Sequence, residues 1–126
     1  MMNVGKQKSY WLNGAKDDFE TAKILIQSKR TLHGLFFCHL TVEKIIKAHV
    51  VEQTKRFAPR SHNLIYLSDI AHIVFDEEDE IFLGILMKYQ LQGRYPDYNP
   101  TIPDKKIVFN YINRTEKLLK WLEAKL

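Results

Sequence analysis

The chain has 126 residues, of which 45% are hydrophobic and 27% are charged, a composition that indicates one globular domain and excludes a chain that is disordered as a whole. It contains no run of about 18 apolar residues, so the sequence predicts no membrane-spanning helix. The net charge of +4 is segregated: residues 1–60 carry a net +6, residues 61–80 a net −6 and residues 81–126 a net +4.

The only cysteine, Cys38, lies in an apolar stretch and has no second thiol with which to form an internal disulfide. This cysteine usage fits a reducing compartment, and the apolar surroundings predict a buried, inert thiol. The first 14 residues contain no apolar signal-peptide core. We therefore expect a single cytoplasmic domain that comprises residues 1–126.

Two long helices are predicted in the first half of the chain. Residues 9–29 place apolar side chains at helical spacing, namely at Trp11, Ala15, Phe19, Ala22 and Ile26. Residues 35–53 are apolar over most of the helix circumference, which is typical of a helix in the centre of a bundle or in a subunit interface. Among the polar exceptions, Glu43 and Lys47 stand four residues apart in the order that favours a surface ion pair.

Two further helices are predicted in the acidic middle of the chain. Ser61 is the expected N-cap of the third helix, whose buried stripe comprises Leu64, Leu67, Ile70, Ala71 and Val74. The acidic run at residues 76–80 predicts the start of a fourth helix, because carboxylates stabilise the N-terminal end of a helix dipole. Gly93 is suited to closing that helix.

The last helix is preceded by the irregular residues 94–103, in which three prolines forbid a regular helix. We expect the final helix to start near Thr101 and to bury Ile107, Tyr111, Ile112, Leu118, Leu119 and Leu122. No segment alternates between apolar and polar residues as a strand does. The sequence therefore predicts an all-α, four- to five-helix up-and-down bundle.

Few residues carry a chemical signature. The chain lacks the glycine-rich phosphate loops and the paired metal ligands of known motifs, and His39 and His49 project to different sides of one helix. We therefore expect no metal and no cofactor.

His62 is the strongest candidate for chemistry, because it follows a basic loop that contains Arg56 and Arg60. An arginine for a phosphate and a histidine for a 2′-hydroxyl proton would suit RNA cleavage. The alternative is a histidine at a helix start beside arginines that are merely solvated.

A second candidate is residues 94–98, where an arginine and two tyrosines form a phosphate-and-base platform on a proline-stiffened loop. There the alternative is that Tyr95 packs on the bundle and Arg94 pairs with an acid.

The order of four motifs resembles the HEPN domain family. The motifs are Ala-Lys-Asp-Asp-Phe at residues 15–19, Val-Glu-Lys-Ile-Ile-Lys-Ala at 42–48, His-Asn-Leu at 62–64 and Arg-Tyr-Pro at 94–96, followed by a closing amphipathic helix. The resemblance covers about residues 9–124 and implies a helical bundle that is commonly a symmetric dimer. It also implies a role beside nucleotides or RNA, since relatives accompany minimal nucleotidyltransferases and some act as toxin ribonucleases.

The ribonuclease members of that family carry a spaced arginine–histidine pair near the region that holds Arg94 here, and no histidine follows Arg94. Arg56 and His62 have a suitable spacing, but they fall in the loop before the third helix, and the apolar Phe57 follows the arginine where the family usually has a polar residue. This departure argues against an efficient enzyme.

Three functions are therefore considered. We expect a HEPN-like nucleotide- or RNA-binding module, a homodimer that partners a minimal nucleotidyltransferase in a toxin–antitoxin-like pair, as the resemblance implies. The residues expected nearest the ligand are Lys44, Lys47, Arg94, Tyr95, Asp97 and Tyr98. The alternatives are a metal-independent endoribonuclease, with His62 as acid or base and Arg56 or Arg94 on the phosphate, and a purely structural helical partner.

Overall fold

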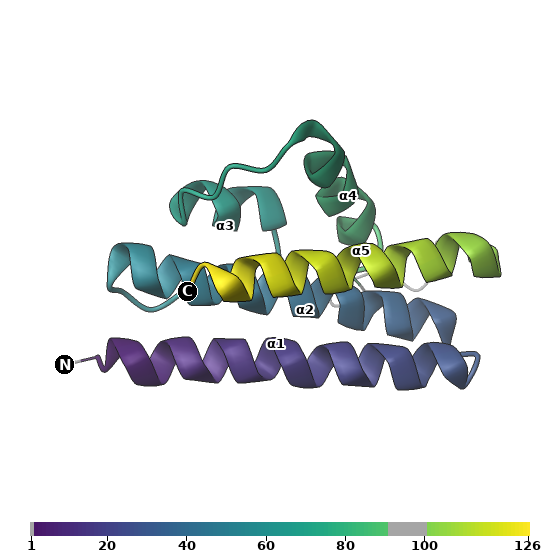
Figure 1. Ribbon diagram of the computed structural model, residues 1–126, viewed down its shortest axis with the longest axis horizontal. Helices are drawn as coiled ribbons and strands as arrows, with labels where there is room; N and C mark the ends of the chain where they lie inside the picture. The colour runs from purple at the N-terminus through teal and green to yellow at the C-terminus, as the bar shows by residue number, and fades with distance from the viewer. Residues whose placement is uncertain (1, 91–100) are drawn as a thin grey trace.

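The computed structural model describes residues 2–90 and 101–126, and within these ranges all regular secondary structure is α-helical (Figure 1). The helices are α1 (Val4–Gln27), α2 (Thr31–Thr54), α3 (Leu64–Ile70), α4 (Glu77–Met87) and α5 (Lys105–Ala124). The predicted all-α bundle is confirmed. The proposed stop at Gly93 and the platform at residues 94–98 lie outside the described residues.

The long helices α1, α2 and α5 pack against one another, and the short helices α3 and α4 cover α2 on the side away from α1 (Figure 1). α1 and α2 are antiparallel, and α5 runs in the same direction as α2 because the chain returns through α3 and α4 to the end at which α2 begins. The turn between α1 and α2 is tight, with Lys29 in the left-handed region at φ 64°. A Cβ atom at Gly34 would collide with the side chain of Ile26 and lie 3.1 Å from the carbonyl oxygen of Ala22, so this glycine lets the two helices approach closely.

Side-chain caps fix the starts of the later helices. Asp76 accepts a hydrogen bond from the backbone N–H of Asp79 at 2.8 Å, and the first turn of α4 is entirely acidic, which confirms that the acidic run begins a helix. The cap of α3 is Asn63, which accepts from the N–H of Tyr66 at 3.0 Å. The predicted cap Ser61 is therefore wrong by two residues; its hydroxyl instead accepts the N–H of Asn63.

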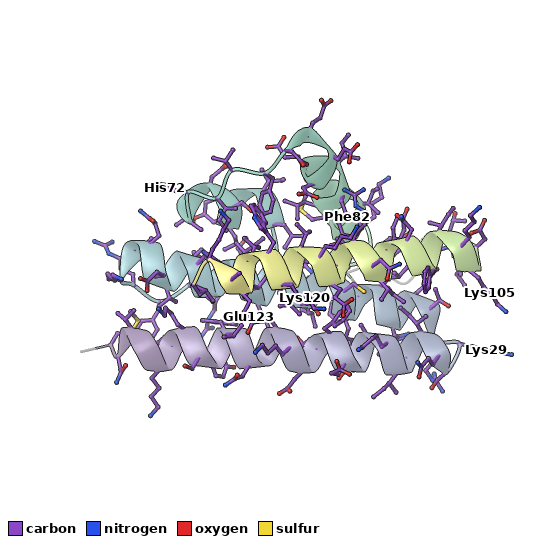
Figure 2. All side chains as sticks on the ribbon, viewed as in Figure 1. Lys29, His72, Phe82, Lys105, Lys120 and Glu123 are labelled. Carbon is purple, nitrogen blue, oxygen red and sulfur yellow. The ribbon has the colours of Figure 1, made fainter. Side chains whose placement is uncertain are left out.

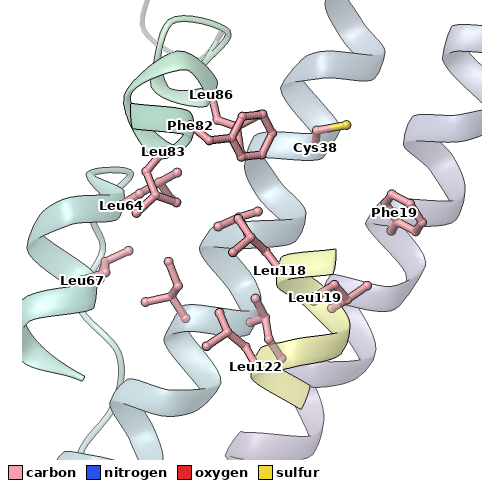
Figure 3. Close-up of a cluster of buried hydrophobic side chains, with 14 of the residues drawn as sticks. Phe19, Cys38, Leu64, Leu67, Phe82, Leu83, Leu86, Leu118, Leu119 and Leu122 are labelled. Carbon is pink, nitrogen blue, oxygen red and sulfur yellow. The ribbon is translucent and has the colours of Figure 1, made fainter. Parts of the chain in front are cut away.

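The core forms around α2, with buried side chains from all four of the other helices (Figure 3). Helix α2 contacts each of the other four helices, as its nearly continuous apolar surface predicts. The largest fully buried side chains outside α2 are Leu64, Leu67, Phe82, Leu83, Leu86 and Leu122. Cys38 is buried in the same core, and burial raises the pKa of its thiol to about 11, which confirms the prediction of a buried thiol.

Two predicted core positions are wrong. Val74 is 87% exposed, because α3 ends at Ile70 and His72 then takes a left-handed conformation with φ 56°, so the helical spacing does not extend to residue 74. Ile107 is 42% exposed, and the neighbouring Val108 is buried in its place. Across the described part of the chain, no helix is both long enough and apolar enough to cross a membrane.

Candidate functional site

One face of α2 carries three polar side chains, one helical turn apart, that the fold buries. His39, Glu43 and Lys47 are 0%, 3% and 5% exposed. The predicted pair of Glu43 and Lys47 forms, with Lys47 Nζ 3.0 Å from Glu43 Oε2, but its expected place on the surface is wrong. The structure buries it because Trp11 of α1 covers Lys47, whose Nζ lies 5.1 Å from the centre of a Trp11 ring, and because His62 covers Glu43.

The second oxygen of this carboxylate binds His62, the residue that the sequence singled out. His62 Nδ1 lies 2.8 Å from Glu43 Oε1, and 42% of the histidine side chain remains exposed. One buried carboxylate thus holds an ammonium group on Oε2 and an imidazole on Oε1. Both contacts offset the large cost of removing a charge from water.

His39 fixes the backbone of the same residue. Its Nε2 lies 3.1 Å from the carbonyl oxygen of His62, and since a carbonyl only accepts, Nε2 carries the hydrogen. Burial lowers the pKa of His39 below its ordinary value of 6.5, which favours the neutral ring. His39 and Glu43, four residues apart on α2, therefore hold residue 62 by its carbonyl oxygen and by its ring.

Lys44, predicted near the ligand, pairs with α1. Its Nζ lies 2.7 Å from Asp18 Oδ2, and the two side chains are 27% and 13% exposed. A Cβ atom at Gly14 would lie 3.2 Å from Lys44 Cδ, so the glycine, which is an irregularity by helix propensity, makes room for this pair. Lys44 and Lys47 thus both have carboxylate partners within the bundle.

The basic connection between α2 and α3 is open to solvent. Arg56 and Arg60 are exposed, and Phe57 between them is 65% exposed. The backbone N–H of Arg56 donates to Thr54 Oγ1 at 3.2 Å, just past the end of α2. This connection leads directly into His62, so two guanidinium groups and an aromatic ring precede the anchored imidazole along the chain. Arg94, Tyr95, Asp97 and Tyr98 lie outside the described residues.

His49 has a separate structural role. Its Nε2 donates to the carbonyl oxygen of Leu122 at 2.7 Å, tying the C-terminal end of α5 to α2. Residues 2–90 and 101–126 contain no group of three or more His, Cys, Asp or Glu side chains arranged for a metal ion.

Sequence reasoning found His62 but missed the two residues that hold it. The spacing of Glu43 and Lys47 predicts a pair on the surface, and His39 is expected to be a helix-surface or partly buried imidazole and not a metal ligand. A signal is present in the sequence: His39 and Glu43 are spaced four apart and so share one face of a helix that is apolar over most of its circumference, where buried polar side chains need partners. Which residue supplies that partner depends on where the α2–α3 connection folds back.

The chain is thus an all-α bundle around a central, largely apolar helix, with a buried polar cluster that reaches the surface at His62. The model of the HEPN domain matches residues 9–125, and the chain belongs to this family. The family relates the chain, in general terms, to nucleotide- and RNA-linked modules. No curated protein matches the chain.

Proposed function

We propose that this chain is a nucleotide- or RNA-binding module whose ligand contacts the α2–α3 connection and His62. The observation that carries this proposal is the placement of exposed Arg56 and Arg60 directly before an imidazole held by Glu43. Guanidinium groups suit phosphates, and exposed Phe57 offers a face on which a base can stack. This differs from the expected contact at Lys44 and Lys47, because those ammonium groups already pair with carboxylates.

Binding of a single-stranded RNA oligonucleotide, followed by fluorescence anisotropy across a salt series, tests the proposal. We expect the double variant Arg56→Gln/Arg60→Gln to bind several-fold more weakly and to lower the salt slope by about 1.4, the value for two lost phosphate contacts on a single strand. Lys106→Gln/Lys120→Gln, which removes two exposed charges from α5 away from the other proposed contacts, is the matched control. Equal losses in both variants, or no binding by the wild type, would refute the proposal.

The segment at residues 94–98 remains part of the proposal as a second ligand contact. An arginine beside two tyrosines can hold a phosphate and a base together. A rise in melting temperature on addition of a nucleotide, lost in Arg94→Ala, would support this contact. If Arg94→Ala keeps the full shift, the ligand does not use that segment.

A second candidate function is metal-independent RNA cleavage, which the 2.8 Å contact between His62 and Glu43 specifically favours. In this reaction His62 takes the proton of a ribose 2′-hydroxyl, and the 2′-oxygen attacks the adjacent phosphorus. The bond to the 5′-oxygen breaks, and that oxygen takes a proton from water. Incubation with RNA in EDTA, beside His62→Ala, separates the two candidates: intact RNA throughout removes the cleavage reaction, and cleavage that His62→Ala abolishes supports it.

We also propose that the chain is a cytoplasmic homodimer that partners a minimal nucleotidyltransferase, as in toxin–antitoxin pairs. Family membership supports this proposal. The dimer is supported further by an apolar pocket of about 290 Å³ where the α1–α2 turn meets the start of α5. Lys29 and Lys105 mark this end of the molecule in Figure 2, and Phe109, which lines the pocket, is 67% exposed.

Sedimentation velocity tests the dimer. We expect Phe109→Glu in α5 to yield a monomer. Ile24→Glu, which changes an exposed apolar residue of α1, should leave the dimer intact. A monomeric wild type would contradict the dimer. Co-expression with a nucleotidyltransferase encoded beside this chain, followed by co-purification, tests the partner separately.

A further inference from the structure

We propose that Glu43 is a positioning residue that holds His62 in the Nδ1–H tautomer, so that Nε2 becomes the proton-accepting atom of this site. Only the role of Nε2 toward a ligand rests on the proposed function. The tautomer itself follows from the contacts of the described residues and can be measured without any ligand.

The two carboxylate oxygens of Glu43 have different partners. The Lys47 ammonium group, 3.0 Å from Oε2, can only donate hydrogen bonds. Oε2 is therefore occupied as an acceptor, and the carboxylate offers Oε1 to His62. Since a carboxylate oxygen also accepts, the hydrogen of this 2.8 Å contact belongs to His62 Nδ1.

A second histidine, His39, also faces Oε1 of Glu43. His39 Nδ1 lies 3.7 Å from Glu43 Oε1 and, among the described residues, has no hydrogen-bond partner. The hydrogen of His39 is on Nε2, where it bonds the His62 carbonyl oxygen. His39 therefore offers no hydrogen to Oε1 and does not compete with His62 for it.

The contact with Glu43 decides which nitrogen of the exposed His62 ring carries the hydrogen. In water, neutral histidine favours the Nε2–H tautomer, which would leave Nε2 unable to accept a proton. Here the carboxylate reverses that preference, as the acid partner of a general-base histidine does. With its carbonyl held by His39 and Nδ1 held by Glu43, His62 presents an unprotonated Nε2 on a side chain that is 42% exposed. A ligand hydroxyl beside a phosphate, such as a ribose 2′-hydroxyl next to the basic connection, matches that acceptor.

The isosteric variant Glu43→Gln makes this inference testable. Lys47 can only donate, so it keeps the amide oxygen of the new side chain at the Oε2 position and turns the NH₂ group toward His62. Nδ1 must then accept, and the ring proton moves to Nε2. Long-range ¹H–¹⁵N correlation spectra of the neutral rings, recorded at alkaline pH, report the tautomer of each histidine.

We expect Nδ1–H for His62 in the wild type, and Nε2–H in Glu43→Gln. His33→Gln, at an exposed position of α2 that leaves Glu43 and Lys47 in place, is the control and should keep Nδ1–H. Should Glu43→Gln fail to fold, Glu43→Leu/Lys47→Met removes both charges together and should also give Nε2–H. An Nε2–H wild type, or an unchanged tautomer after loss of the carboxylate, would overturn the inference.

RNA experiments on the same variants keep the two proposals apart. If the tautomer moves as expected but the wild type neither binds nor cleaves RNA, the positioning role stands and the proposed function fails. If RNA is cleaved equally by the wild type and by Glu43→Gln with its Nε2–H tautomer, the function stands and Nε2 of His62 is not its proton acceptor.

Discussion

Glu43 is the residue on which the buried polar cluster depends. Its side chain and that of Lys47 are only 4% and 7% exposed, so neither charge is stabilised by bulk water. Such a pair is weak evidence of stability, because burying both charges costs about as much as their attraction returns. Removing one charge, however, leaves the other buried without its partner.

The buried pair leads to a prediction about single and double variants. Glu43→Leu leaves the Lys47 ammonium uncompensated and should destabilise the protein by about 3–5 kcal/mol, whereas Glu43→Leu/Lys47→Met should cost much less because both charges are removed. Urea denaturation measures each free energy of unfolding. A double variant less stable than the single variant would contradict the buried pair.

Histidine burial predicts how stability changes with pH. Burial lowers the pKa values of His39 and His49 below 6.5, so the unfolded chain binds protons that the folded chain does not. The free energy of unfolding should therefore fall as pH drops from about 7 to about 5.5, and this loss is absent above the ordinary histidine pKa. Lys8, Glu52 and Lys125 also act on His49, the two cations lowering its pKa and the carboxylate raising it.

Denaturation at several pH values checks this, with His49→Gln as the informative variant. A glutamine can still donate to the Leu122 carbonyl but does not titrate, so the loss on acidification should be smaller. His33→Gln, at an exposed position of α2, should keep the wild-type profile. Stability that rises on acidification over this range would contradict the burial of these rings.

At the scale of helices, the hairpin of α1 and α2 is the framework on which the site is built. It brings Trp11 over Lys47 and Asp18 to Lys44, and it does so with glycines at two close approaches between the helices. Helix propensity alone disfavours both glycines. Their presence is explained by packing, since a side chain at either position would meet the neighbouring helix.

Two glycine substitutions should therefore have opposite effects. Gly34→Ala places a methyl group against Ile26 and should destabilise the protein by about 1–3 kcal/mol, despite the better helix propensity of alanine. Gly84→Ala in α4 meets no atom within 4 Å and should stabilise by about 0.5–1 kcal/mol. Thermal unfolding measures both, and a stabilising Gly34→Ala would show that the two helices are further apart.

At the scale of the whole molecule, α2 is enclosed by the other four helices. Its buried residues, Cys38 among them, should become accessible only when that enclosure opens. The Cys38 thiol is 0% exposed and its pKa is raised to about 11, so both access and ionisation oppose its reaction.

Thiol labelling should consequently report global unfolding. We expect Cys38 to react slowly with a disulfide reagent near pH 8 under native conditions and rapidly in urea, with a rate that follows the unfolded fraction. Rapid labelling of the native protein would mean that the core around α2 opens locally.

The sequence by itself determined the helical class, the central place of α2 and the start of α4, because apolar periodicity and capping carboxylates are local signals. It also indicated His62, from its place after a basic loop. It misplaced Val74 and Ser61, since the end of α3 and its cap depend on one short turn of backbone that propensity does not specify.

Only the tertiary structure decided that Glu43 and Lys47 are buried and that the carboxylate binds His62. Residues 43 and 62 are brought together by the α2–α3 connection folding back on α2, with Trp11 of α1 closing the other side. Helical spacing identifies which residues share a face, but it does not identify what covers that face. That choice depends on contacts between residues far apart in the chain, which no local pattern records.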